Sequence, residues 1–162
     1  MIRIREVELQ DNLSLAKMIR AVFEEHDAPT EGTVYTDPTT DALYELFQVG
    51  KSVLWVAEKA GQILGCCGIY PTPGLPKGCA ELVKFYIPKH SRGIGIGKEL
   101  MERSIESAME FDYTEIYIES MPVYSKAVSI YEQQGFEMLL EPLGESGHTG
   151  CTIWMLKKLS NV

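Results

Sequence analysis

A glycine-rich turn between a strand and a helix constrains this chain more than any other stretch. Residues 82–87 are apolar and aromatic apart from one lysine and end at Pro88, which predicts a buried strand. From Gly97 to about Phe111, apolar and small residues recur at helical spacing and the acidic residues lie off that stripe, which predicts an amphipathic helix. Between the two elements, residues 92–98 read Arg-Gly-Ile-Gly-Ile-Gly-Lys.

The chemistry of this turn favours an anion. Its glycines allow the backbone to turn tightly and to approach a ligand closely. The first N–H groups of the following helix lack partners within the helix, and that end of the helix dipole is positive. Residues 82–98 contain four Lys or Arg and no Asp or Glu, in a chain of net charge −8. We expect a phosphate-bearing ligand here, the alternative being a plain glycine-rich connection with surface lysines.

Two common phosphate loops do not fit the spacing. A P-loop has four residues between its first glycine and Gly-Lys, then Ser or Thr, whereas three residues separate Gly93 from Gly97 and glutamate follows the lysine. A dinucleotide loop reads G-x-G-x-x-G, and this turn reads G-x-G-x-G. The pattern Arg92-x-x-Gly95-x-Gly97 instead resembles the acetyl-CoA pyrophosphate signature of the GCN5-related N-acetyltransferase (GNAT) superfamily.

A second pattern downstream supports this resemblance. Residues 124–136 read Tyr-x-x-Ala-x-x-x-Tyr-Glu-x-x-Gly-Phe, which is similar to the superfamily's Asn-x-x-Ala-x-x-x-Tyr-Glu-x-x-Gly-Phe. Tyr124 stands where the family usually has Asn, which affects one contact to the cofactor and not the fold. The spacing predicts a helix that Gly135 ends as a left-handed cap.

The order of predicted elements along the chain agrees with the same superfamily. We expect strands near 2–7, 52–58, 62–70, 82–87, 114–120, 136–140 and 152–159, and helices near 12–26, 41–49, 97–111 and 124–135. Residues 30–40 and the glycine-containing span 141–150 read as loops, the second one flexible. The resemblance implies an α/β (α+β) GNAT fold in one domain over 1–162, with a mixed central sheet of about seven strands flanked by about four helices. In that fold two parallel strands separate, and the pantetheine arm of the cofactor lies between them.

Acetyl transfer to an amine needs a proton acceptor, a hydrogen-bond donor to the carbonyl oxygen and a proton for the leaving thiolate. By resemblance, Tyr131 is the proton donor, or else a core aromatic residue. Glu81 matches the general base of the histone-acetylating branch, or else it is a surface carboxylate at a strand end. Glu119 is a second carboxylate that can orient the amine. A backbone N–H of the segment 85–87 would polarise the carbonyl, and no metal is needed.

The resemblance also implies contacts to acetyl-CoA and to the acceptor. The expected cofactor contacts are Phe85, Tyr86, Ile87, Arg92, Gly93, Ile94, Gly95, Gly97, Lys98, Tyr124 and Ala127. The candidate acceptor contacts are Tyr35, Glu119 and His148. For Tyr35 and His148, ordinary packing or a plain loop position is the alternative.

Composition limits the cellular setting and the partners. The excess of 23 Asp and Glu over 15 Lys and Arg argues against nucleic acid and mildly favours a cationic acceptor. Because no apolar run approaches membrane-spanning length and no signal peptide begins the chain, we expect a cytoplasmic protein without a membrane partner. The four cysteines lack zinc spacing and are expected to be buried free thiols, with a catalytic thiol at Cys79 as a minor alternative.

These observations predict an acetyl-CoA-dependent N-acetyltransferase that acts on a primary amine of a small molecule, as a monomer or a homodimer. A protein acceptor, at lysine or at the N-terminus, is the alternative within the same chemistry. A non-catalytic acyl-CoA-binding regulatory module and a nucleotide-binding protein are the alternatives from other classes.

Overall fold

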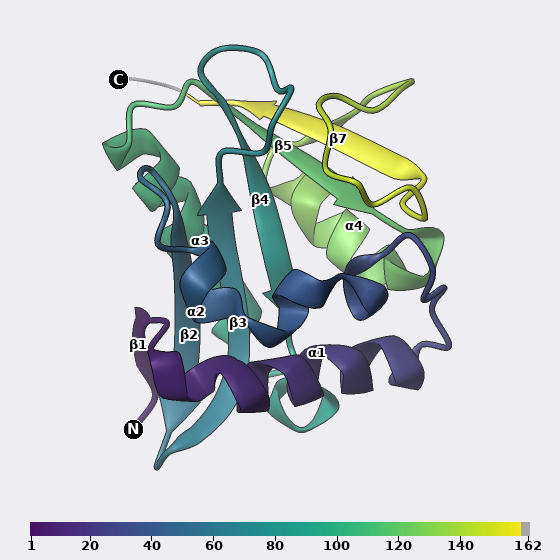
Figure 1. Ribbon diagram of the computed structural model, residues 1–162. Helices are drawn as coiled ribbons and strands as arrows, with labels where there is room; N and C mark the ends of the chain where they lie inside the picture. The colour runs from purple at the N-terminus through teal and green to yellow at the C-terminus, as the bar shows by residue number, and fades with distance from the viewer. Residues whose placement is uncertain (160–162) are drawn as a thin grey trace.

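The computed structural model describes residues 1–159 and contains a seven-stranded mixed sheet in the order β1-β2-β3-β4-β5-β7-β6 (Figure 1). The strands are β1 (Arg3–Glu6), β2 (Val53–Lys59), β3 (Gln62–Tyr70), β4 (Cys79–Tyr86), β5 (Glu115–Ser120), β6 (Glu137–Met138) and β7 (Ile153–Lys158). The α-helices are α1 (Asn12–Glu25), α2 (Leu43–Leu46), α3 (Ile96–Glu110) and α4 (Ser125–Gln133). The predicted α/β fold is confirmed. None of these helices has the length and apolar character that crossing a bilayer requires.

Helices cover both faces of the sheet (Figure 1). Alternate residues of each strand point to opposite faces, so every inner strand contributes to two cores. Leu54 and Cys66 pack in the core under α1 and α2, whereas Ala57 and Cys67 pack in the core under α3 and α4. The adjacent cysteines therefore lie on opposite faces, as the strand period predicts.

The parallel pair β4 and β5 is hydrogen-bonded over a short length only. Its register pairs are Cys79–Glu115, Ala80–Ile116 and Glu81–Tyr117, although β4 continues to Tyr86 and β5 to Ser120. Figure 1 shows the two strands diverging beyond this point. Because each strand keeps its other neighbour, β3 or β7, the sheet opens between them without losing a strand.

Strand β4 contains a bulge just beyond this branch point. Its pairing with β3 passes from Val83–Gly68 to Tyr86–Cys66, so three residue steps on β4 face two steps on β3. Lys84 lies in the bulge with a φ of +56°, in the left-handed region that side chains disfavour. The bulge breaks the simple alternation that the sequence suggests for this strand.

Several boundaries differ from those predicted. The helix expected over 41–49 is a single turn, 43–46. The loop expected over 30–40 contains two 3₁₀ turns, at 34–36 and 38–41, because Thr33 and Asp37 accept hydrogen bonds from backbone N–H groups there. The strand expected over 136–140 is reduced to two residues at the exposed edge of the sheet.

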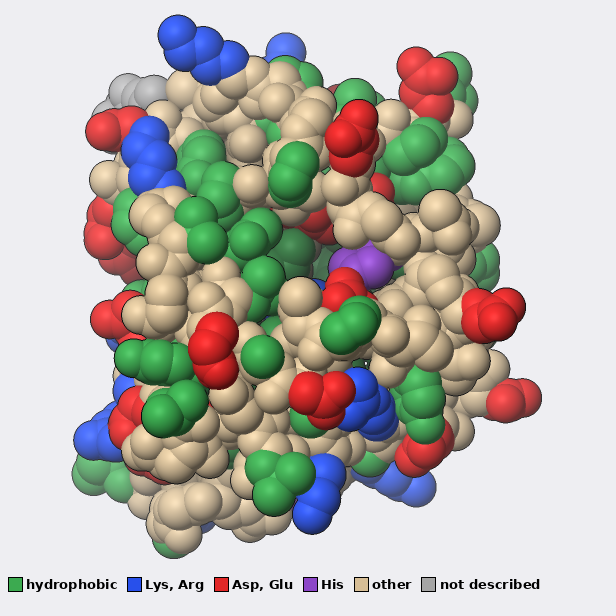
Figure 2. All heavy atoms as spheres, in the orientation of Figure 1, with side chains coloured by type: hydrophobic (Ala, Val, Ile, Leu, Met, Phe, Trp, Pro, Cys, Tyr) green, Lys and Arg blue, Asp and Glu red, His purple; other side chains and the backbone are tan. Residues whose placement is uncertain are grey.

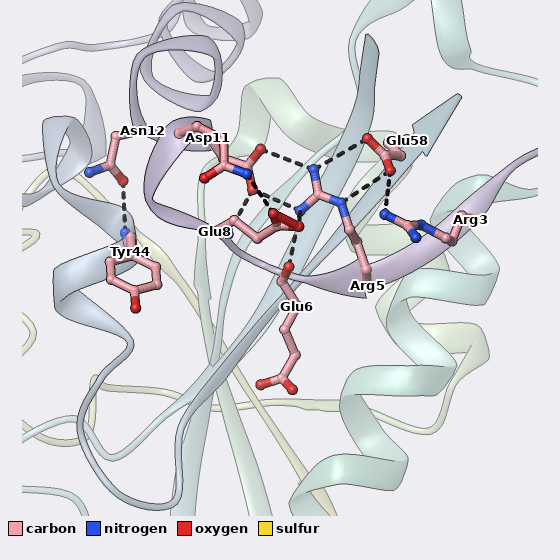
Figure 3. A network of polar contacts seen from close by, with 9 residues as sticks. Arg3, Arg5, Glu6, Glu8, Asp11, Asn12, Tyr44 and Glu58 are labelled. Carbon is pink, nitrogen blue, oxygen red and sulfur yellow. Dashed lines mark hydrogen bonds and ion pairs between the residues drawn. The ribbon is translucent and has the colours of Figure 1, made fainter. Parts of the chain in front are cut away.

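A network of charged groups fastens β1 to the start of α1 (Figure 3). The guanidinium of Arg5 donates to both carboxylate oxygens of Asp11, at 2.8 and 3.0 Å, and pairs with Glu58 on β2 at 3.2 Å. The Asp11 carboxylate also accepts from the Glu8 N–H at 2.7 Å. Burial raises the pKa of Asp11, but the hydrogen bonds from Arg5 and Glu8 outweigh it and hold that pKa below its ordinary value.

We expect Asp11→Asn to lower the free energy of unfolding by about 3 kcal/mol at pH 7, because Arg5 would keep a largely buried charge without its main partner. The pKa of Asp11 is depressed in the folded state, so its contribution is present above the unfolded-state pKa and is lost as pH falls through the folded-state pKa. The difference between variant and wild type in urea unfolding should therefore shrink below about pH 4.

The exposed pair between Arg20 and Asp41 provides a matched control. The Asp41 side chain is 59% exposed, so solvent screens the pair and Asp41→Asn should lower the stability much less than Asp11→Asn does. Equal losses in the two variants would contradict the role given to the buried network.

Candidate active site

A cavity of about 790 Å³ lies where β4 and β5 separate. Its walls come from the end of α1, from β4, from the glycine turn, from the end of β5 and from the start of α4. In the orientation of Figure 1, the surface shows a recess near its centre with hydrophobic side chains on one side and a histidine beside it (Figure 2). The predicted site residues that line this cavity are Glu81, Phe85, Tyr86, Ile87, Arg92, Gly93, Gly95, Gly97, Lys98, Glu119, Tyr124, Ala127, Tyr131 and His148.

The glycines of the turn have different roles. Gly93 and Gly95 have φ angles of +83° and +84°, and a Cβ at either position would meet no atom within 4 Å. Glycine is needed there for the backbone conformation, and the space before it is open. Gly97 lies within α3, where a Cβ would contact the Phe85 ring at 3.4 Å. The turn therefore delivers the N-terminus of α3 directly into the cavity wall.

Arg92 is held between the turn and α1. Its Nε donates to the Ile87 carbonyl oxygen at 3.0 Å, and its two terminal nitrogens donate to the Glu25 carboxylate at 2.5 and 2.9 Å. This hydrogen-bonded pair lowers the pKa of Glu25. Lys98, in contrast, is exposed and lies 3.9 Å from Glu102. Arg92 is thus the oriented cation at this end of the cavity.

Glu81 lies at the branch point of the sheet and is only 5% exposed. Its Oε1 accepts a hydrogen bond from Thr72 Oγ1 at 2.6 Å. Burial raises the pKa of Glu81 to about 7, and the neighbouring Glu119 carboxylate adds to this, while Thr72 and Lys84 oppose it. The alternative of a surface strand-end carboxylate is therefore wrong. A carboxyl group with this pKa exchanges protons readily near neutral pH.

Side-chain hydrogen bonds connect the loop 141–150 to residues that line the cavity. Ser146 Oγ and Tyr117 Oη both donate to the Glu119 carboxylate, at 2.5 and 2.8 Å. His148 Nε2 lies 2.8 Å from Asp37 Oδ2. The carboxyl group of Asp37 is partly buried, which raises its pKa, yet hydrogen bonds from His148 and Thr39 lower that pKa to about 2. These contacts close one side of the cavity.

Two predicted contacts lie elsewhere. Tyr35 is not in the cavity wall: its hydroxyl donates to Glu24 Oε2 at 2.8 Å. The 3₁₀ turn at 34–36 directs it there, and the sequence carried no sign of that turn. Ile94 is also outside the wall and is 60% exposed, because the positive φ angles of its glycine neighbours turn it outward.

The two tyrosines of the second motif differ in position. Tyr131 is 5% exposed, and its ring packs between Phe85 and Phe136, with centroid distances of 5.9 and 6.0 Å. Burial raises its pKa well above the ordinary value, so its hydroxyl stays protonated. Tyr124 precedes α4, and its ring lies against α1 at His26, 5.1 Å between centroids. Its hydroxyl is buried and makes no hydrogen bond within residues 1–159.

Sequence reasoning missed two groups in the cavity region and misplaced a third. Thr72, which binds Glu81, carried no motif, and Cys151 lines the wall. Lys84 was counted with the basic residues of the phosphate turn, but it is 6% exposed and lies within electrostatic range of Glu81 and Asp37. Cys79 is a buried free thiol whose pKa burial raises to about 12, which leaves little thiolate for catalysis.

A glycine turn at a helix N-terminus, beside two separating parallel strands, is the arrangement that the sequence resemblance led us to expect of an acetyltransferase. Residues 19–136 match the Acetyltransferase (GNAT) family. The chain belongs to this family and is an acyltransferase.

Individual relatives agree with this assignment. Over 157 residues the chain is 34% identical to YjgM, an uncharacterized N-acetyltransferase of Escherichia coli (strain K12), covering 96% of this chain and 94% of that protein. A GNAT-family acetyltransferase from Staphylococcus aureus Mu50 superposes with a TM-score of 0.82 at 18% identity, covering 99% of this chain and all of the other. YncA from Salmonella typhimurium, whose structure contains acetyl-CoA, has a TM-score of 0.77 at 15% identity, covering 99% and 95% of the two chains.

The open space before Gly95 generates a prediction about binding. Gly95→Glu places a carboxylate beside the N-terminus of α3, so it should repel a phosphate and weaken CoA binding by more than about tenfold in calorimetry. Gly61→Glu is the matched control, because Gly61 has a φ of +81° and nothing within 4 Å of its Cβ position, but lies in the β2–β3 hairpin. Equal CoA affinity in the two variants would exclude this turn as the phosphate site.

Proposed function

We propose that this chain transfers the acetyl group of acetyl-CoA to a primary amine of a small molecule, through one GNAT domain spanning residues 1–162. The observation that carries the proposal is Glu81, a buried carboxyl group with a pKa raised to about 7, placed where the central strands part. A base of this kind suits an amine, which arrives protonated at neutral pH.

The cofactor end of the cavity has the chemistry that a pyrophosphate requires. The turn 93–97 offers backbone N–H groups with open space before Gly95, and Arg92 offers an oriented guanidinium. Since Glu25 binds that guanidinium, a pyrophosphate reaching Arg92 must share or replace this carboxylate. Ala127 leaves room beside α4 for the pantetheine arm, and Tyr124 offers a buried hydroxyl without a partner among residues 1–159.

Acetyl-CoA supplies the acetyl group as a thioester. We assign to Glu81 the removal of a proton from the acceptor ammonium, directly or through water, so that a free amine forms the new C–N bond. A backbone N–H in the segment 85–87 polarises the carbonyl oxygen. The acceptor nitrogen then loses its second proton to solvent. As the C–S bond breaks, the protonated hydroxyl of Tyr131 donates its proton to the thiolate; Glu81 afterwards releases a proton to solvent and Tyr131 regains one from it.

The anchored loop favours a small acceptor over a protein. Its contacts from Ser146 to Glu119 and from His148 to Asp37 close the end of the cavity opposite the turn. A lysine or an N-terminus within a polypeptide would have to enter with its flanking chain, and these contacts stand in its way.

Two measurements test the proposal together. Acetyl-CoA and CoA should each stabilise the protein against thermal unfolding, by about 2.7 kcal/mol at a hundredfold excess over the dissociation constant. A panel of small amines should release free CoA thiol from acetyl-CoA. Stabilisation without thiol release from any amine, peptide or protein would identify a non-catalytic acyl-CoA-binding module, and no stabilisation at all would refute the cofactor assignment.

Glu81→Gln should lower kcat by about a hundredfold near pH 7 and leave the affinity for CoA unchanged, because glutamine keeps the shape but accepts no proton. The wild-type profile of kcat/KM should rise through the pKa of about 7 that the structure supports for Glu81. In the variant, kcat/KM should not rise through a pKa near 7. It should increase only at higher pH, where more of the acceptor is present as free amine. Glu106→Gln, on the exposed face of α3, is the control; a wild-type profile in Glu81→Gln would place the base elsewhere.

Glu81→Gln should also change how the free energy of unfolding depends on pH. The pKa of Glu81 is raised in the folded state, so between about pH 4 and pH 7 the unfolded chain releases a proton that the folded chain keeps. The free energy of unfolding should therefore fall with rising pH by up to about 1.4 kcal/mol per unit. Glu81→Gln should remove this fall and be more stable than wild type at pH 8 in urea titrations.

Tyr131→Phe keeps the ring between Phe85 and Phe136 and removes only the hydroxyl. If Tyr131 protonates the thiolate, kcat should fall by about a hundredfold while the melting temperature stays nearly constant. Normal turnover combined with a marked loss of stability would assign Tyr131 to the core alone.

A further inference from the structure

We infer that the acceptor carries a carboxylate close to its amine, as an amino acid does, and that Lys84 binds this carboxylate. The inference rests on the proposed function and names the substrate class of the same site. It follows from the position of Lys84, from its charged neighbours and from its backbone.

Lys84 is a buried cation at the acceptor end of the cavity. Its side chain is 6% exposed and lines the cavity together with Glu81, Glu119 and His148. None of the ion pairs within 4.0 Å among residues 1–159 includes the Lys84 ammonium, and none of the side-chain hydrogen bonds there comes from it. A buried charge is costly unless an opposite charge meets it, so an anion in the cavity would stabilise this arrangement.

The acidic groups nearest to Lys84 are engaged by other partners. Burial lowers the pKa of Lys84. The negative charges of Asp37 and Glu81 oppose this effect, because they favour the protonated form of the lysine. Asp37, however, is bound by His148 at 2.8 Å and by the N–H and hydroxyl of Thr39 at 2.9 and 2.7 Å. Glu81 is bound by Thr72 and is only partly ionised near neutral pH. Neither carboxyl group contacts Lys84, so its ammonium remains available to a ligand.

The backbone at Lys84 departs from strand geometry at the bulge of β4. Four other residues besides glycine have a positive φ, namely Asp27, Lys51, Ala60 and Asp112, and all four lie in exposed turns. Lys84 alone among the described residues has this conformation inside a strand, at a φ of +56°. Glycine would adopt it more readily. Strained backbone of this kind clusters at functional sites, and Lys84 lies in the wall of the cavity.

The charges around the acceptor end then match a zwitterion. Glu81 and Glu119 suit the ammonium group of the acceptor, and Lys84 suits an anionic group on the same molecule. Glu81 and Lys84 line the same cavity and lie within electrostatic range of each other, so one small ligand with both charges can meet both residues. An acceptor amine within a polypeptide, where the neighbouring carboxylate is an amide, lacks the second charge.

The test compares the twenty common L-amino acids with their carboxamides as acceptors, using acetyl-CoA and release of CoA thiol. In the wild type, at least one amino acid should have a kcat/KM more than about tenfold above that of its amide. Lys84→Met should remove this preference, so that kcat/KM for the amino acid falls to the level of that for its amide, and should leave the KM for acetyl-CoA nearly unchanged. Lys59→Met, an exposed lysine at the end of β2, is the control and should keep the preference.

The comparison with carboxamides distinguishes recognition of the acceptor carboxylate by Lys84 from an effect of Lys84 on the general base Glu81. Loss of Lys84 also removes an attraction that lowers the pKa of Glu81, but a weaker or stronger base alters both acceptors of a pair alike. Lys84→Gly should also lose the preference, and it should fold with an unchanged or higher melting temperature because glycine relieves the positive φ. Lys84→Arg should keep part of the preference.

Three outcomes would overturn the inference. They are equal use of acid and amide by the wild type, an equal loss on both acceptors in Lys84→Met, and turnover confined to amides or peptides. The last result would leave the acetyltransferase function standing, whereas a failure of CoA binding and of thiol release with every acceptor would count against both.

Discussion

The early end of hydrogen bonding between β4 and β5 is the constraint on which the rest of the site depends. The two strands pair over three residues and part after Glu81 and Tyr117, while β3 and β7 hold their outer edges. Backbone groups on the two inner edges beyond this point face the cavity, where they lack partners across the gap and can bind a ligand. The site is therefore built into the sheet itself, and Glu81 is buried because it stands at the branch point.

Electrostatics within the opening differ from those of the protein as a whole. The chain has a net charge of −8, yet its cavity presents Arg92 at one end and Lys84 at the other. Arg92 is oriented by Glu25 of α1, so the first helix and the glycine turn are coupled through one ion pair. Lys84 has no such contact among the described residues. Arg92, at the glycine turn, is therefore an exposed cation paired with Glu25, whereas Lys84 is a buried cation on β4.

What the sequence predicted well are features determined over a few residues. Glycine at 93 and 95 indicated a turn that other residues adopt poorly, and helical spacing indicated the inner face of α3. The place of Glu81 followed from the family pattern, but its burial and raised pKa did not, because both depend on Thr72 and on where the strands separate. Sequence patterns over a few residues do not indicate where β4 and β5 stop pairing.

What the sequence did not predict depends on contacts far apart in the chain or on a break in regular geometry. The loop 141–150 contacts the rest of the protein partly through the hydrogen bond between His148 and Asp37, 111 positions earlier. Tyr35 was a candidate acceptor contact because the resemblance places its loop beside the acceptor, whereas a 3₁₀ turn directs its hydroxyl to Glu24. Lys84 was counted with the basic residues near the glycine turn from its sequence position alone, and the bulge in which it lies could not be read from that position.

The bulge also links the two charged groups of the acceptor end. On a regular strand, Glu81 and Lys84 are three positions apart and point to opposite faces, but here both line one cavity. Burial drives each toward its neutral form, raising the pKa of Glu81 and lowering that of Lys84. A bound zwitterion of the proposed kind would oppose this, because its carboxylate favours the charged form of Lys84 and its ammonium favours that of Glu81. Binding of the acceptor would thus favour the ionised form of Glu81, which is the form that removes its proton. An amine without a carboxylate would not provide the anion that favours the charged form of Lys84.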